Sequence, residues 1–304
     1  MCLHGRLNAA VRTQPRSMLP QVDFDSTPEV SDFVRSKFRA LYPESSDAWL
    51  SRLFVDVDGL FTGRSESFAP IDLKYHNLRH TLMATLCMAL LLEGHHESSG
   101  GSDLKARDFE LAIAAVLLHD SGYLKLKTDT RGTGAKYTYC HILRSCAFAS
   151  SFLPEMGATE LEVENVIAAI NCTGPNSDIT RLRFKDAVSK VVGCALATAD
   201  YLGQLSDPDY PEKLGFLYSE FHESDEFANV PMERRAFKSE ADLVSRTPGF
   251  WLKFVRPKLE RDFHSTFKLL ERPLGSGSNA YLDAVDANFA IINGRIAASK
   301  TPGA

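Results

Sequence analysis

Apolar residues recur along most of the chain at intervals of three and four, a spacing that predicts helices. The first helix is expected to begin near Ser26, because Pro28 and Glu29 follow this capping residue and an apolar periodic segment comes next. Similar patterns predict helices near 46–61, 77–96, 106–121, 136–153, 159–171, 184–204, 209–228, 232–246, 249–271 and 279–297. No segment has the two-residue period of a strand. The pattern therefore predicts an all-α protein.

The domain organisation follows from where this periodicity starts and stops. Residues 1–25 mix Arg, Pro, Gln and small residues without a period, so we expect a flexible N-terminal arm. Residues 26–297 contain no repeat and no long linker, which favours a single helical domain. Residues 298–304 are expected to form a C-terminal tail.

Two of the predicted helices, at 111–118 and 191–197, are apolar nearly all round and so belong in the middle of a bundle. The first ends in His119 and Asp120, and Asp200 follows the second. Burying an unpaired carboxylate costs several kcal/mol, so these acids need partners. A cation is the simplest partner.

Composition narrows the functional class. The 304 residues are 44% hydrophobic, which can supply a core, and the net charge of −5 argues against a broad surface for a nucleic-acid polymer. The six cysteines are scattered without a CxxC pair, as suits a reducing cytoplasm. We see neither a signal peptide nor a run of transmembrane length, and expect a cytoplasmic protein with a small ligand and no membrane contact.

Histidines supply the remaining candidate chemistry. His76 and His80 are four positions apart, hence on one face of a helix, although such a pair can equally be a surface or core feature. The interpretation as a surface or core pair is less favoured once His119, Asp120 and Asp200 are considered. Three apolar helices then direct His80 and these residues to one interior point. Two nitrogens and two oxygens suit one divalent ion of Mn, Fe, Zn, Co or Mg.

Three motifs resemble those of a known family. They are YHNLRH at 75–80, LLHDSGY at 117–123 and ATADYLGQLSDP at 197–208. In order and approximate spacing they resemble the HD-domain metal-dependent phosphohydrolase superfamily, most closely the cyclic-nucleotide phosphodiesterases. The resemblance implies an HD/PDEase-like helical bundle in which His80, His119, Asp120 and Asp200 bind the first metal and Asp120 can bridge to a second.

The resemblance also implies catalytic roles. His76 matches the histidine that protonates the leaving oxygen, and with Asp120 it forms the expected catalytic pair. The implied reaction is hydrolysis of a phosphoester in a nucleotide or cyclic nucleotide by metal-activated water. Further candidates for contact with substrate or a second metal are His141, Asn77, Cys172 and Arg144. His141 can also be interpreted as a core histidine with an ordinary hydrogen-bond partner.

Several alternatives stay open at this point. Dinuclear relatives carry a further histidine where this chain has Asn171 and Cys172, so the number of metals is not fixed. The enzyme could be a phosphodiesterase or a phosphomonoesterase. An HD-type di-iron oxygenase is disfavoured by the missing histidine, and a non-catalytic nucleotide sensor by the retained His76 and complete first ligand set. A homo-oligomer is compatible with the sequence.

Overall fold

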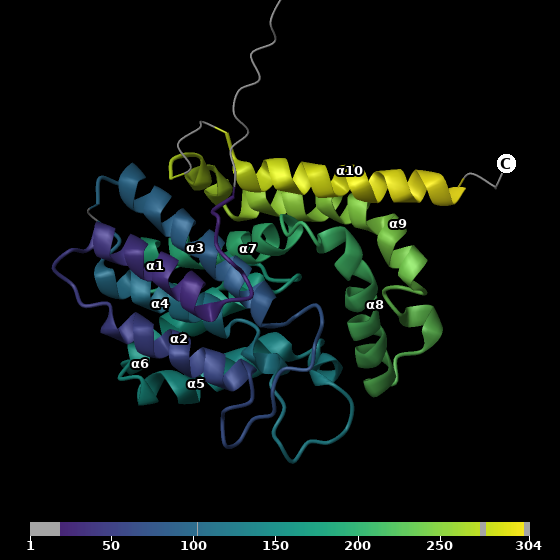
Figure 1. Ribbon diagram of the computed structural model, residues 1–304, viewed down its shortest axis with the longest axis horizontal. Helices are drawn as coiled ribbons and strands as arrows, with labels where there is room; N and C mark the ends of the chain where they lie inside the picture. Colours follow the sequence, from purple (N-terminus) through teal and green to yellow (C-terminus); the bar gives the residue numbers. More distant parts are fainter. Residues whose placement is uncertain (1–18, 102, 274–277, 301–304) are drawn as a thin grey trace, which may run out of the picture.

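Two long helices form the centre of the molecule in the computed structural model, which describes residues 19–101, 103–273 and 278–300. They are α3 (Leu78–Ser98) and α7 (Ala187–Leu205), which lie side by side (Figure 1). Their close approach depends on Gly203, because a Cβ added there would lie 2.9 Å from the Cα of Ala84. The nearly all-apolar helix α4 (Ala106–Leu118) is also buried, so the two helices expected in the middle are confirmed there.

The other helices surround this centre. They are α1 (Thr27–Leu41), α2 (Ala48–Phe61), α5 (His141–Glu155), α6 (Glu160–Ile170), α8 (Tyr210–Phe227), α9 (Glu240–Phe250) and α10 (Ala280–Lys300). In Figure 1, α1, α2 and α4–α6 occupy one side, α8 and α9 the other, and α10 runs along one edge. Within the described ranges there is no β-strand, only an isolated bridge between Phe68 and Leu126. The all-α prediction is confirmed.

The start of α1 agrees with the sequence signals. The Ser26 hydroxyl accepts a hydrogen bond from the Glu29 amide at 3.4 Å, and Pro28 lies in the first turn, where no intrahelical N–H is needed. Val30, Val34 and Phe38 form the buried face of this helix. The capping residue therefore marks the start of α1, and the apolar spacing determines the face that it buries.

The helices expected at 232–246 and 249–271 were wrongly placed. A 3-10 turn covers Met232–Arg234, and the α-helix begins only at Glu240. It then runs through Pro248 into π-helical turns at Trp251–Val255 and Lys258–Asp262. The helical run ends before His264, which has a φ of 53°.

The π turns have a physical reason. Trp251, Val255, Leu259 and Phe263 are four residues apart and all are buried. On a regular α-helix, side chains at this spacing drift by about 40° at each step, because four residues exceed the 3.6 of one turn. The wider π turns offset that drift and keep the four side chains on the core face.

Part of the expected flexible arm is attached to the domain. Phe24 lies 5.6 Å from the Arg79 guanidinium, measured to its ring centroid, and Asp25 accepts a hydrogen bond from Arg79 at 2.8 Å. Leu19 and Val22 pack against the core. The arm boundary at residue 25 is therefore too late, and residues 1–18 lie outside the described residues. At the other end, residues 298–300 belong to α10 rather than to a tail.

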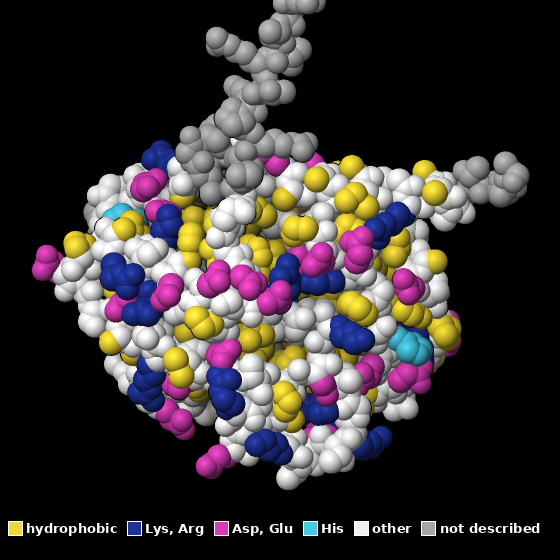
Figure 2. All heavy atoms as spheres, viewed as in Figure 1, with side chains coloured by type: hydrophobic (Ala, Val, Ile, Leu, Met, Phe, Trp, Pro, Cys, Tyr) yellow, Lys and Arg dark blue, Asp and Glu magenta, His cyan; other side chains and the backbone are white. Residues whose placement is uncertain are grey.

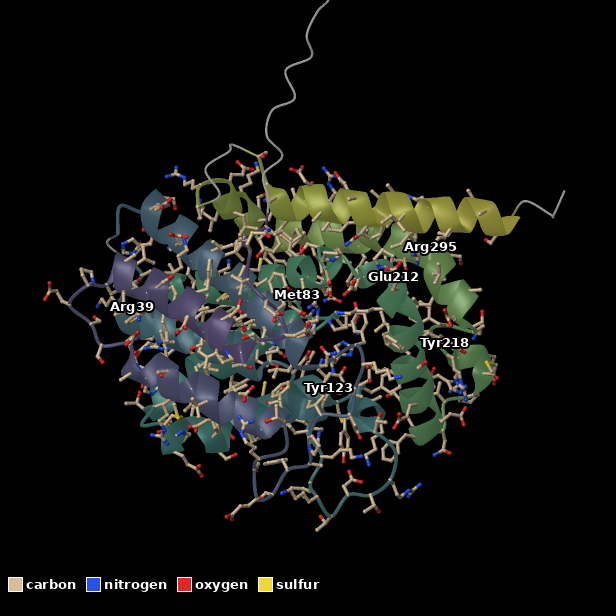
Figure 3. The ribbon with its side chains drawn as sticks, in the orientation of Figure 1. Arg39, Met83, Tyr123, Glu212, Tyr218 and Arg295 are labelled. Carbon is tan, nitrogen blue, oxygen red and sulfur yellow. The ribbon has the colours of Figure 1, made fainter. Side chains whose placement is uncertain are left out.

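Contacts between the C-terminal helices complete the domain. The guanidinium of Arg295 on α10 pairs with Glu212 on α8 (Figure 3). On the face shown in Figure 2, acidic and basic side chains are interspersed. Among the described helices, none has the length and apolar character needed to cross a membrane. The five cysteines in the described part are free, and four of them are buried.

Candidate metal centre

Three central helices each deliver part of a buried polar cluster. His80 lies in the first turn of α3, where the Asn77 side chain caps the helix by accepting the His80 amide at 3.1 Å. His119 and Asp120 directly follow α4, and Asp200 lies on α7. The helix ends thus place side chains from distant parts of the sequence at one point.

The distances within this cluster are short. His80 Nε2 lies 3.2 Å from Asp120 Oδ2 and 3.3 Å from Asp200 Oδ1. His119 Nε2 lies 3.4 Å and 3.6 Å from the same two oxygens. Two imidazole nitrogens therefore face one oxygen from each carboxylate. This is the quartet that the sequence predicted to converge.

Three atoms of the cluster lack the partners that buried polar atoms normally have. His80 Nε2, His119 Nε2 and Asp120 Oδ2 are inaccessible to solvent and make no hydrogen bond of acceptable geometry, despite the short distances between them. His119 Nδ1 lies 2.6 Å from the carbonyl oxygen of Val116, to which it can donate, so Nε2 is left as a metal-binding lone pair. His80, His119 and Asp120 form a buried group that could hold a metal ion.

Strong electrostatic interactions shift the pKa values of the histidines and carboxylates in this cluster. Burial alone would lower the pKa of His80, but the carboxylates of Asp120 and Asp200 outweigh it and raise that pKa to about 10. Burial alone would raise the pKa of Asp120, whereas His119 and His80 hold it well below its usual range. The pKa of Asp200 is lowered against burial in the same way. The site is therefore one in which both carboxylates are ionised and strongly favour a neighbouring cation.

His76 lies beside the cluster and has a carboxylate partner that the sequence analysis missed. Its Nδ1 is 2.6 Å from Glu220 Oε2 on α8, and Glu220 Oε1 accepts the Tyr75 amide at 2.8 Å. Glu220 is buried, so its position is fixed by these two contacts. Its separation of 144 residues from His76 left no local signal.

An aromatic stack joins His76 to His141. Tyr123 stacks with both of them, with ring centroids 4.8 Å from His76 and 4.7 Å from His141 and nearly parallel planes, and the two histidine centroids lie 6.4 Å apart (Tyr123 is labelled in Figure 3). His141 Nε2 lies 3.7 Å from Asp120 Oδ1, the oxygen that does not face His80. Gly122 allows this arrangement, because a Cβ there would lie 1.9 Å from the His141 carbonyl oxygen. The structure thus brings His141 to the cluster.

The remaining sequence candidates have other contacts. The Arg144 guanidinium donates to the carbonyl oxygens of Gly122 and Leu124, at 2.6 Å and 2.8 Å, and lies on the Tyr137 ring. The Cys172 thiol donates to the Ala168 carbonyl oxygen, and burial raises its pKa to about 12. Asn77 serves as the cap of α3. These contacts give all three a structural task, and their roles toward substrate or a second metal stay predictions.

The fold and the site define an all-helical protein with a buried His/Asp group able to hold a metal. The chain belongs to the Npun_R2479-like family, whose model matches residues 59–269. That range includes every side chain of the cluster together with His76, His141 and Glu220. No curated protein matches the chain. Since the family name specifies no reaction, the chemistry must be inferred from the side chains.

Proposed function

We propose that this protein is a metal-dependent phosphohydrolase of the HD type, acting on a phosphoester of a nucleotide or cyclic nucleotide. The observation that carries the proposal is the group of unpartnered, buried ligand atoms on His80, His119 and Asp120, with Asp200 beside them. These residues occur along the chain in the same order as the three HD-like motifs. A merely structural cluster would be expected to satisfy these atoms internally.

The four side chains fit a divalent cation of borderline-to-hard character. His80 and His119 would contribute their Nε2 atoms, and Asp120 and Asp200 one oxygen each. A divalent ion bound there would lower the pKa of a coordinated water and offset charge on phosphoryl oxygens. Burial of the ligand atoms strengthens every such interaction, because little solvent screens it.

His76 is the proposed proton donor to the leaving oxygen. With Nδ1 held by Glu220, the protonated ring presents its Nε2–H away from that carboxylate. The contact with Glu220 fixes the orientation of the ring, and Tyr123 restricts its tilt by stacking. Glu220 therefore acts through His76, and His76 is the residue that would touch the substrate.

One contact favours a second candidate function. His141 Nε2 lies near Asp120 Oδ1, the oxygen that does not face His80. His141 and Asp120 are therefore two candidate ligands for a second metal. Two metals are compatible with a phosphohydrolase and are required for the HD-type di-iron oxygenase. The number and identity of bound metals therefore separate the two functions.

The test uses purified full-length protein stripped of metal and reloaded separately with Mn, Fe, Zn, Co or Mg. Each form is assayed against cyclic nucleotides, nucleoside monophosphates and linear phosphodiesters, with metal content measured in parallel. Turnover of a phosphoester by wild type but not by His80→Ala is the expected result. Two tightly bound irons with oxygen uptake would establish the oxygenase, and ligand binding without turnover of any phosphoester would favour a sensor.

A further inference from the structure

A chain of hydrogen bonds leads from Tyr75 through Gln204 to Asp200. The Tyr75 hydroxyl donates to Gln204 Oε1 at 2.8 Å. Gln204 Nε2 then donates to Asp200 Oδ1 at 3.2 Å, and to the Asp200 carbonyl oxygen at 3.1 Å. We propose that Gln204 is a positioning residue for the metal-binding carboxylate of Asp200, and that Tyr75 holds the Gln204 amide in place by donating to its oxygen. The inference rests on the metal site proposed above.

The direction of this chain follows from the groups at its two ends, the Tyr75 hydroxyl and the oxygens of Asp200. The Tyr75 phenol group carries one proton that it can donate, and the hydroxyl meets Gln204 Oε1 at 2.8 Å. Asp200 presents two acceptor oxygens, so the Gln204 NH2 group faces it, and the amide oxygen is left to accept from the Tyr75 hydroxyl. With the amide reversed, two oxygens would face each other across the Gln204–Asp200 contact.

The oxygen that Gln204 binds is the one that faces the site. Asp200 Oδ1 is also the oxygen 3.3 Å from His80 Nε2 and 3.6 Å from His119 Nε2. A hydrogen bond to this atom restricts rotation of the carboxylate and keeps its charge directed at the two imidazoles. Groups that orient metal ligands in this way typically contribute about 10- to 100-fold to metal affinity.

Two further contacts hold Tyr75 in place and so fix the position of its hydroxyl. Its amide donates to Glu220 Oε1, and its ring stacks at 6.2 Å from the His80 ring. Removing the hydroxyl alone leaves both contacts in place. Tyr75→Phe therefore isolates the effect of the hydrogen bond to Gln204.

The experiment measures the dissociation constant of Mn²⁺ for the metal-free full chain, by calorimetric titration and by competition with a chelator. Gln204→Met keeps the side-chain length but removes the donor, and we expect Mn²⁺ affinity to fall by about tenfold or more. Tyr75→Phe should cause a smaller loss, about two- to fivefold, because the Gln204 amide oxygen then loses its partner and the side chain is held less firmly. Circular dichroism verifies that each variant is folded.

A matched control separates positioning from general loosening of α7. Asn288 on α10 donates to the carbonyl oxygens of Leu205 and Asp207, at 2.8 Å and 2.7 Å, just beyond Gln204. Asn288→Ala removes two buried hydrogen bonds at this end of α7 without touching Asp200. It should lower the melting temperature and leave Mn²⁺ affinity unchanged.

Each outcome has a distinct meaning. Wild type that binds no Mn²⁺ would overturn the proposed metal site, and this inference with it, before any variant is compared. Wild type that binds while folded Gln204→Met binds equally well would overturn the positioning role alone. Equal losses in Gln204→Met and Asn288→Ala would also overturn it. If Gln204→Met does not fold, Tyr75→Phe decides, and unchanged Mn²⁺ affinity in that variant contradicts the inference.

Discussion

Two polar clusters, each with a buried carboxylate, lie next to each other but differ in how their charges are balanced. Two neighbouring residues of α3 belong to different clusters. His80 is part of the metal-site cluster, and Arg79 is part of an ion-pair network. In that network, Arg79 lies 3.3 Å from Asp207 and 2.8 Å from Asp25, and Lys213 also pairs with Asp207. There the cations of the chain pair with both oxygens of the Asp207 carboxylate.

The metal-site cluster lacks that internal balance. Its Nε2 atoms and one Asp120 oxygen are buried without hydrogen bonds, whereas both Asp207 oxygens have protein partners. Burial would raise the pKa of Asp207, but Lys213, the Asp209 amide and Arg79 lower it. A similarly buried carboxylate therefore serves stability in one cluster and, by our proposal, a ligand in the other. The metal-site cluster is distinguished by unpartnered atoms that can bind a metal, whereas Arg79 Nε, the unpartnered atom of the network, carries a proton.

The largest effect that separates the clusters should come from His80→Ala. We expect Mn²⁺ affinity to fall by more than about 100-fold, beyond the range typical of residues that only orient a ligand. Calorimetric titration measures the change, with Asp207→Asn as the control that should bind Mn²⁺ normally. Normal metal binding by His80→Ala would remove the distinction between the two clusters.

The next effect concerns turnover alone. His76→Gln removes the proposed proton donor while the four ligand side chains remain, so phosphoester hydrolysis should slow by about 10²- to 10⁴-fold at unchanged metal content. Steady-state kinetics on the best substrate of the panel and elemental analysis provide the two readouts. Loss of metal from this variant would contradict its role as the acid.

A third effect should appear only in stability. Asp207→Asn leaves Arg79 and Lys213 without their shared carboxylate, and breaking such a buried pair costs about 3 kcal/mol or somewhat more. We expect the loss of stability to lie at the low end of this range, because the side chains of Arg79 and Lys213 are 19% and 16% exposed and solvent weakens their ion pairs. Urea unfolding of the metal-free protein measures it. An unchanged unfolding midpoint would show that the network contributes little.

The smallest effect is a pH dependence of the same network. The pKa of Asp207 is lower in the folded protein than in the unfolded chain, so its ionised form contributes stability above the unfolded value of about 3.9. That contribution is lost as pH falls from there through the folded pKa. Unfolding of wild type and Asp207→Asn should therefore differ most near neutrality and converge in acid. A constant difference across this range would argue against the electrostatic origin.

The sequence was sufficient for the fold class and for the convergence of the quartet, because both depend on local patterns. The nearly all-apolar segments before His119 and Asp200 required central helices, and central helices bring their ends together. Ser26 and Pro28 marked a helix start that the structure confirms. Such features are determined by periodicity and capping, which a single sequence displays.

The partners of these residues could not be predicted in the same way. Glu220 reaches His76 only because α8 folds back beside the start of α3, and no local pattern indicates that approach. Gln204 did leave a signal, since it lies one helical turn after Asp200 and so on the same face. Tyr123 was part of a quoted motif, yet its stacking with His141 depends on where α5 begins.

The π turns after α9 also bear on how this chain can vary in evolution. Four buried side chains from Trp251 to Phe263 keep one face only through a strict four-residue interval. Replacing any one by another apolar residue changes a local volume, whereas deleting one residue between them rotates all that follow. Among related chains, we therefore expect the length of this segment to vary less than the identity of its residues.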